Sequence, residues 1–124
     1  MKLIDIVEIL GLEAIIAGND QLEIMTACGA DLMSDVLAFT QEKSLLLTGL
    51  TNPQVVRTAE MIDIKVIIFV RGKRPLVATV ELAREKGIYL YLSARSMFEC
   101  CGILYQNGLQ PEEINGCFSP GEEE

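Results

Sequence analysis

The segment KVIIFVRGKRP, residues 65–75, decides the fold of this chain. Residues 66–70 are all apolar, and they lead directly into the cations Arg71, Lys73 and Arg74. A short and continuous apolar run is typical of a strand that is buried on both faces of a sheet. The cations that follow it, in a chain of formal net charge -8, indicate that the end of this strand has a special role.

Two further apolar runs, SLLLTG (44–49) and IYLYLS (88–93), have the same character. Helical segments starting at Pro53, Pro75 and Ser96 follow the three runs in turn, and proline at the first helical position or a capping box marks each start. This alternation predicts three parallel strands, covered by helices on both faces of the sheet.

The amino-terminal part is less regular. Residues 3–10 place apolar side chains at the spacing of one helical face. Residues 12–17 and 22–30 read as two strands around a tight connection, and Asp31 can cap a short helix after them. The fold class predicted is therefore α/β, a three-layer αβα domain with a mostly parallel central sheet and an amino-terminal hairpin-like pair of strands.

Length and composition bound the organisation. At 124 residues and 13.7 kDa, the chain is long enough for one domain, which we expect at residues 1–109. Residues 110–124, QPEEINGCFSPGEEE, are rich in Pro, Gly and Glu, and we expect this acidic tail to be poorly ordered. No apolar run reaches the roughly 18 residues that a membrane span needs, and the start of the chain does not read as a signal peptide, so a cytoplasmic protein is expected.

Several classes of chemistry are disfavoured. The acidic balance argues against nucleic acid as a partner, and the chain has no histidine to serve as a general base or a zinc ligand. The four cysteines form no CxxC pair and suit buried thiols, so no metal and no cofactor are expected. Asp31 and Asp35 could share a divalent cation, but helix capping explains them better.

A family resemblance adds to this reading. The five segments that carry it are GADLMSDVLA (29–38), LTGLTNPQ (47–54), VIIFVRGKRP (66–75), AREKGI (83–88) and SARSMFECCGILYQNGL (93–109). In order along about 100 residues, they resemble the free-standing DRTGG-domain proteins, a family also similar to the amino-terminal domain of HPr kinase/phosphorylase. The segment that gives the family its name is replaced here by QLEIMTA (21–27), and no GxxxxGK[ST] loop is present. DRTGG domains occur as regulatory inserts in some pyrophosphatases and phosphotransacetylases, so the resemblance implies an accessory, regulatory role.

The three strand-to-helix loops should meet at one edge of the sheet, where open parallel sheets bind their ligands. Cations there precede helix amino termini and oppose the helix dipoles, which favours a bound phosphate or carboxylate. The candidate ligand-binding residues are Thr48, Gly49, Thr51, Asn52, Arg71, Gly72, Lys73, Arg74, Arg95 and Ser96. Two alternatives stay open: the polar residues can serve for capping alone, and the cations can be solvated or paired with carboxylates.

The sequence therefore favours a non-catalytic cytoplasmic regulatory domain that binds a small anionic metabolite, with an adenine nucleotide as the leading candidate. The alternative is a protein-interaction module of a metabolic or redox enzyme system with no small ligand. Catalytic residues are not expected. An apolar content of 50% in a small acidic domain predicts a homodimer, and a partner enzyme is a further possibility.

Overall fold

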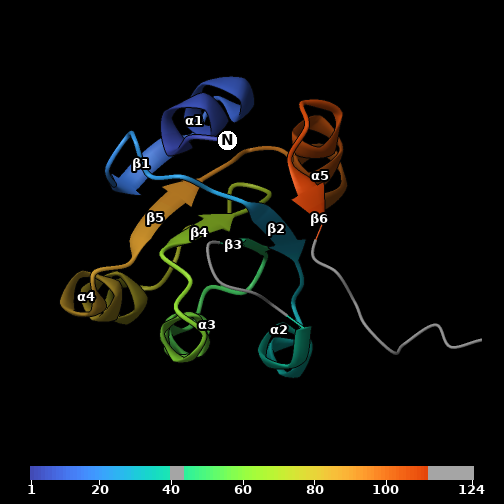
Figure 1. Cartoon of the computed structure of the whole chain (residues 1–124). Coiled ribbons are helices and arrows are strands. Elements are labelled where there is room, and N and C mark those ends of the chain that lie inside the picture. The colour runs from blue at the N-terminus through green and yellow to red at the C-terminus, as the bar shows by residue number, and fades with distance from the viewer. Residues whose placement is uncertain (40–43, 112–124) are drawn as a thin grey trace, which may run out of the picture.

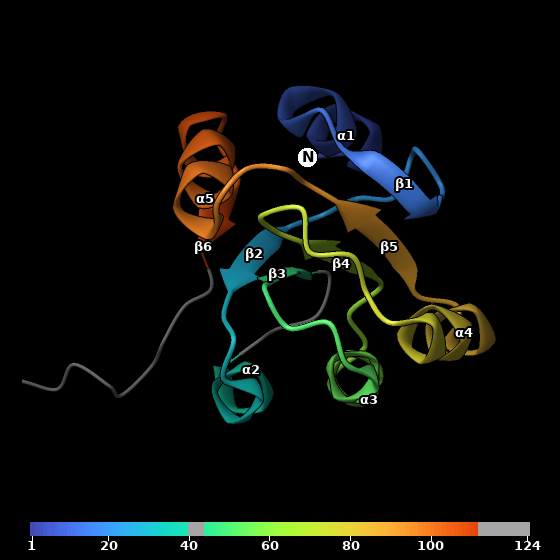
Figure 2. The same cartoon turned by 180° about the vertical axis from the view of Figure 1, so that it is seen from behind.

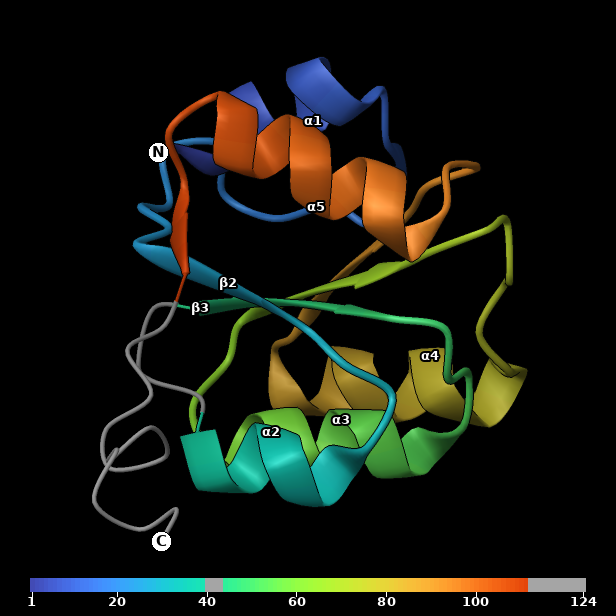
Figure 3. The same ribbon diagram turned by 90° about the vertical axis from the view of Figure 1, so that its right-hand side faces the viewer.

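The computed structural model describes residues 1–39 and 44–111, which form a sheet between two layers of helices (Figure 1). Views from behind and from the side show the same layers (Figure 2, Figure 3). The predicted three-layer αβα architecture is confirmed. The helices on one face are α1 (Leu3–Leu10) and α5 (Met97–Gln106), and those on the other are α2 (Met33–Phe39), α3 (Pro53–Met61) and α4 (Val77–Lys86).

The sheet has six strands in the order β1-β5-β4-β3-β2-β6. All neighbouring strands are parallel except β1, which pairs antiparallel with β5 at one edge. The three predicted parallel strands, β3, β4 and β5, are confirmed. The strands are β1 (Glu13–Ile16), β2 (Thr26–Gly29), β3 (Ser44–Thr48), β4 (Val66–Phe69), β5 (Tyr89–Leu92) and β6 (Gln110–Pro111).

The two amino-terminal strands run in opposite directions, as a hairpin would, but they do not pair with each other. β5, β4 and β3 lie between β1 and β2 in the sheet. The connection between them is hydrogen-bonded to the amino terminus instead: the Leu3 N–H donates to the Leu22 carbonyl at 2.9 Å, and the Ile24 N–H donates to the Met1 carbonyl at 2.7 Å. The antiparallel direction of the predicted pair is confirmed, but the connection carries the chain from β1 at one edge to β2, next to the opposite edge strand β6, so the two strands do not form a hairpin.

Alternation along the strands divides the core into two layers. Leu45 and Leu47 of β3 point toward α1 and α5, whereas Leu46 points toward α2, α3 and α4. Val66 and Ile67 of β4 divide in the same way, and all five side chains are fully buried. Burial on both faces explains why these strands read as continuous apolar runs.

Two boundaries differ from the sequence prediction. α3 begins at Pro53 as expected, but α4 begins at Val77 rather than Pro75, since the Leu76 N–H donates to the Thr51 carbonyl at 3.1 Å and Leu76 keeps an extended backbone. Residues 110–111 of the predicted tail form β6 and pair with β2; residues 112–124 lie outside the described residues. Within the described part of the chain, no helix is both long and apolar enough to span a membrane.

Candidate functional site

The loops that follow β3, β4 and β5 form one continuous edge, here called the rim (residues 48–52, 71–74 and 93–96). Backbone hydrogen bonds join the β4 and β5 loops: the Arg71 N–H donates to the Arg95 carbonyl at 2.8 Å, and the Gly72 N–H to the Ser93 carbonyl at 2.8 Å. The β3 loop is joined to the chain that follows the β4 loop, since the Thr51 carbonyl accepts from the Leu76 N–H at 3.1 Å. Because each loop fixes its neighbour, the rim is a positioned unit and not three independent turns.

Arg71 has an unusual backbone at the centre of the rim. Its φ of 59° lies in the left-handed region, which costs a residue with a Cβ about 1–2 kcal/mol. Its guanidinium lies near Gly49, with Nη2 3.7 Å from the place that a Cβ on Gly49 would take. Strained backbone held by surrounding bonds is concentrated at functional sites, so Arg71 is the strongest indication of function at the rim.

Asp31 reaches the rim from the loop after β2. Its Oδ1 accepts from the Gly49 N–H at 2.8 Å and from the Thr48 hydroxyl at 3.0 Å. Two donors that the sequence assigned to a ligand are therefore already occupied by a carboxylate of the chain. Asp31 follows β2, and β2 is a parallel neighbour of β3, so both strands end at the same edge of the sheet. The sequence analysis missed Asp31 because it interpreted β2 as part of a hairpin.

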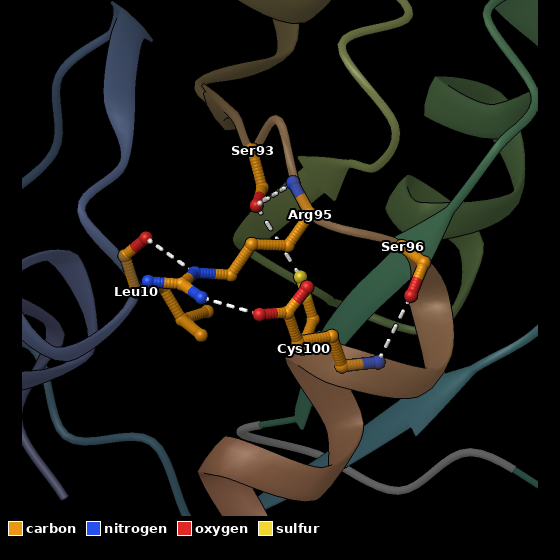
Figure 4. Close-up of polar contacts among 6 residues, drawn as sticks. Leu10, Ser93, Arg95, Ser96 and Cys100 are labelled. Atoms are coloured by element: carbon orange, nitrogen blue, oxygen red, sulfur yellow. Dashed lines mark hydrogen bonds and ion pairs between the residues drawn. The ribbon is translucent and has the colours of Figure 1, made fainter.

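Two of the four predicted cations have partners within the chain. Arg74 Nη2 donates to both carboxylate oxygens of Glu13 on β1, each at 2.9 Å. Arg95 Nη1 donates to Glu99 Oε2 at 2.5 Å, and its Nε reaches the Leu10 carbonyl at 3.5 Å (Figure 4). These contacts hold both guanidinium groups at the border of the rim.

Arg71 and Lys73 differ from this pair. Both residues are exposed, and no ion pair or side-chain hydrogen bond of either is found among residues 1–39 and 44–111. The described structure thus leaves two side-chain cations at the rim available to an anion from outside.

The remaining predicted residues have structural contacts. Asn52 caps α3 by accepting from the Gln54 N–H at 3.0 Å, and Ser96 caps α5 by accepting from the Glu99 N–H at 3.1 Å. The Thr51 carbonyl accepts from the Thr79 hydroxyl at 2.7 Å, which ties the β3 loop to α4. These residues shape the rim without requiring a ligand.

A buried thiol lies beneath the rim. Burial raises the pKa of Cys100 and outweighs two effects that lower it, the hydrogen bond from its Sγ to Ser93 Oγ and the charge of Arg95; the charge of Glu99 adds to the rise. Burial and the neighbouring Cys100 also raise the pKa of Cys101. Both groups are protonated near neutral pH and are therefore poor nucleophiles. The described residues contain no cluster of three metal-ligating side chains.

A second feature was missed by the sequence interpretation. An apolar groove of about 390 Å³ lies between α5 and the β2 and β6 edge of the sheet, and none of the predicted site residues lines it. The sequence feature that could have indicated this groove is the spacing of Phe98 and Tyr105 around Gly102 in α5. The groove is lined by Ala27, Gly29, Leu47, Phe98, Cys101, Gly102, Leu104, Tyr105, Leu109, Gln110 and Pro111.

Comparison with known proteins gives a likeness of fold. No family model and no curated protein matches the sequence. The structure is similar to the CBS and DRTGG domains of the regulatory region of Clostridium perfringens pyrophosphatase, solved in complex with its activator diadenosine tetraphosphate. The TM-score is 0.65 with 15% identity over 90% of this chain. The chain spans about half (51%) of that protein chain, and the likeness supports a DRTGG-related fold.

Proposed function

We propose that this chain is a non-catalytic regulatory domain that binds a small anionic metabolite at the rim, with an adenine nucleotide as the leading candidate. The observation that carries the proposal is Arg71, an exposed cation held in a left-handed conformation by bonds from the neighbouring loop. The left-handed turn directs its backbone N–H to the Arg95 carbonyl and leaves the side chain exposed at the rim, which favours a role in binding.

Arg71 and Lys73 are the direct contacts in this proposal. A guanidinium can hold two phosphate oxygens at once, whereas the ammonium of Lys73 acts as a point charge. Arg74 and Arg95 serve as flanking charges, since their ion pairs with Glu13 and Glu99 offset much of their attraction for an anion.

Asp31 limits the affinity of the site. Its carboxylate and the Arg71 guanidinium both lie within 4 Å of the position that a Cβ on Gly49 would take. A bound phosphate would gain from Arg71 and be repelled by Asp31, a balance that suits a reversible sensor better than a tight store. The amino terminus of α3 adds partial positive charge on the same edge.

The choice of an adenine nucleotide rests on two supports. The pyrophosphatase region that shares the fold was solved with diadenosine tetraphosphate, which carries both adenine rings and phosphates. The sequence resemblance to DRTGG domains implies a regulatory role in the same direction. The likeness to HPr kinase/phosphorylase stays a prediction from the sequence.

The test is a binding measurement on the full chain. Calorimetry and melting curves with AMP, ATP, diadenosine tetraphosphate and inorganic phosphate should show saturable binding of at least one phosphate compound. Lys73→Ala should weaken that binding by about tenfold or more, the value of one charge-assisted bond. Arg57→Ala is the control, because it removes an exposed cation of α3 and leaves the rim intact. Absence of binding by the wild type across the panel would refute the proposal.

An interaction module without a small ligand is the second candidate. The apolar groove beside α5 favours it, because exposed apolar surface of this kind marks interaction sites. A chain that binds no phosphate compound but associates with a protein would support this candidate. Catalysis has less support, since the chain has no histidine and burial raises the pKa of its Cys100 and Cys101 thiols.

A further inference from the structure

The outer face of α5 carries an apolar stripe that packs against the core only at Cys101. Phe98 is 87% exposed and Tyr105 is 67% exposed, whereas Cys100 and Leu104 on the opposite face are buried in the core. With Cys101 and Gly102, the two aromatic residues follow the i, i+3, i+4, i+7 spacing of one helical face. We call these four residues, Phe98, Cys101, Gly102 and Tyr105, the α5 stripe.

Gly102 is the second observation. A glycine inside a helix lowers stability relative to alanine, so its presence needs a reason. A Cβ placed on Gly102 would meet no atom within 4 Å, and the described part of this chain gives no such reason. Close approach of a surface from outside the chain provides one, because a helix without a side chain at that point lets another backbone come near.

The stripe is also self-complementary. Phe98 and Tyr105 lie at equal distances in sequence from a point between Cys101 and Gly102. A second α5 that crosses this point in the antiparallel direction brings Phe98 of each copy opposite Tyr105 of the other, as a two-fold axis requires. Aromatic pairs of this kind add to the gain from burying their surface.

Charge favours the same arrangement. Copies of a chain with net charge -8 repel each other, so contact is least costly where the surface is uncharged. Glu99 is the charged residue of α5, and its carboxylate is held by Arg95 rather than directed at the stripe.

Pairing through the neighbouring edge of the sheet is less favourable. β6 has two residues, Gln110 and Pro111, and proline cannot donate a hydrogen bond to an added strand. Figure 1 and Figure 3 show α5 lying beside this edge. The groove between them widens the apolar surface that a second copy can cover.

We propose that two copies of this chain form a two-fold dimer through antiparallel packing of their α5 helices, with the closest approach at Gly102 and Phe98 of each copy against Tyr105 of the other. The dimer predicted from composition thereby obtains a defined surface. The proposal does not depend on the rim, and it is tested without any ligand.

The first test measures the mass of the full chain by light scattering and sedimentation over a range of micromolar concentrations. The wild type should approach twice 13.7 kDa. Phe98→Glu places two like charges in the interface and should raise the dissociation constant at least about thirtyfold, as for a central interface residue. Val77→Glu is the matched control: Val77 is 75% exposed on α4, on the other face of the sheet, and its change should leave the dimer intact.

Gly102→Leu separates a structural role from an interface role. Leucine favours the helix, and a Cβ at this position meets no atom within 4 Å, so the variant monomer should melt no lower than the wild-type monomer. The same side chain obstructs close packing, so the dimer should dissociate at least about tenfold more readily. A variant that dimerises as well as the wild type would overturn the assignment of Gly102.

Mixed variants test the direction of packing. Phe98→Glu mixed with Tyr105→Lys should recover a mixed dimer, whereas Phe98→Glu mixed with Phe98→Lys should not, because residue 98 lies opposite residue 105. Recovery in the second mixture alone would refute the antiparallel arrangement. A monomeric wild type, or a dimer that Phe98→Glu and Gly102→Leu leave unchanged, would refute the proposal.

Discussion

Replacing Arg71 by glycine should have opposite effects on the unliganded protein and on ligand binding. The left-handed backbone of Arg71, with φ of 59°, costs about 1–2 kcal/mol, and glycine removes that cost. Glycine also makes the unfolded chain more flexible, which offsets about 0.4–1 kcal/mol. The net expectation is that Arg71→Gly is more stable by about 0–1.6 kcal/mol, with a central value of about 0.8 kcal/mol, and melts up to about 6 °C higher.

Binding should change in the other direction. A charge-assisted hydrogen bond contributes about 1.5–3 kcal/mol, so Arg71→Gly should bind phosphate compounds about 10-fold to 150-fold more weakly than the wild type. The backbone N–H of residue 71 still donates to the Arg95 carbonyl in this variant, so the rim keeps its shape. Stability and affinity are therefore separated by one substitution.

The assay combines melting curves and calorimetry, with ATP, diadenosine tetraphosphate and inorganic phosphate as probes. Arg71→Asn provides a second variant, because asparagine tolerates the left-handed region and also lacks the charge. Arg57→Ala controls for the loss of a positive charge elsewhere on the surface. Variants at residue 71 that melt lower than the wild type and bind the probes equally well would show that Arg71 is structural, and would refute the reasoning.

Three further predictions concern neighbouring groups. Arg74→Ala should lower the unfolding free energy by no more than about 1 kcal/mol, because its ion pair with Glu13 is exposed. A double-mutant cycle of Arg74 and Glu13, measured by denaturant unfolding, should show coupling between the two residues. Asp31→Asn should bind phosphate compounds about threefold to tenfold more tightly in calorimetry, since it removes a negative charge near Arg71; unchanged affinity would place the anion elsewhere. The raised pKa of Cys100 means that the folded state holds the thiol proton more firmly than the unfolded state does. This contribution to the unfolding free energy is complete below the ordinary thiol pKa of about 8.5, and it is lost as the pH rises through the pKa of the folded state. The melting temperature of the wild type should fall between pH 8 and pH 10. A Cys100→Ala variant whose melting temperature falls as steeply over this range would contradict the prediction.

The sequence alone determined the central part of the fold. β3, β4 and β5 could be read directly because strands buried on both faces must be apolar throughout, and the helices between them carry local start signals such as Asn52 before Pro53. Once three strands are parallel, their carboxyl ends meet at one edge. The grouping of Arg71, Arg95 and the β3 loop therefore followed from periodicity and topology rules.

Tertiary structure decided what local patterns do not encode. β1 and β2 both read as strands, but hydrogen bonds between residues 20–24 and the amino terminus, far apart along the chain, placed them at separate positions in the sheet. The same placement brought Asp31 to Gly49 and brought Glu13 to Arg74. Charge pairing at the rim depends on which strands become neighbours, and that choice is made by the packing of the whole domain. The sequence alone therefore named the rim cations, and only the folded chain could show which of them already have partners.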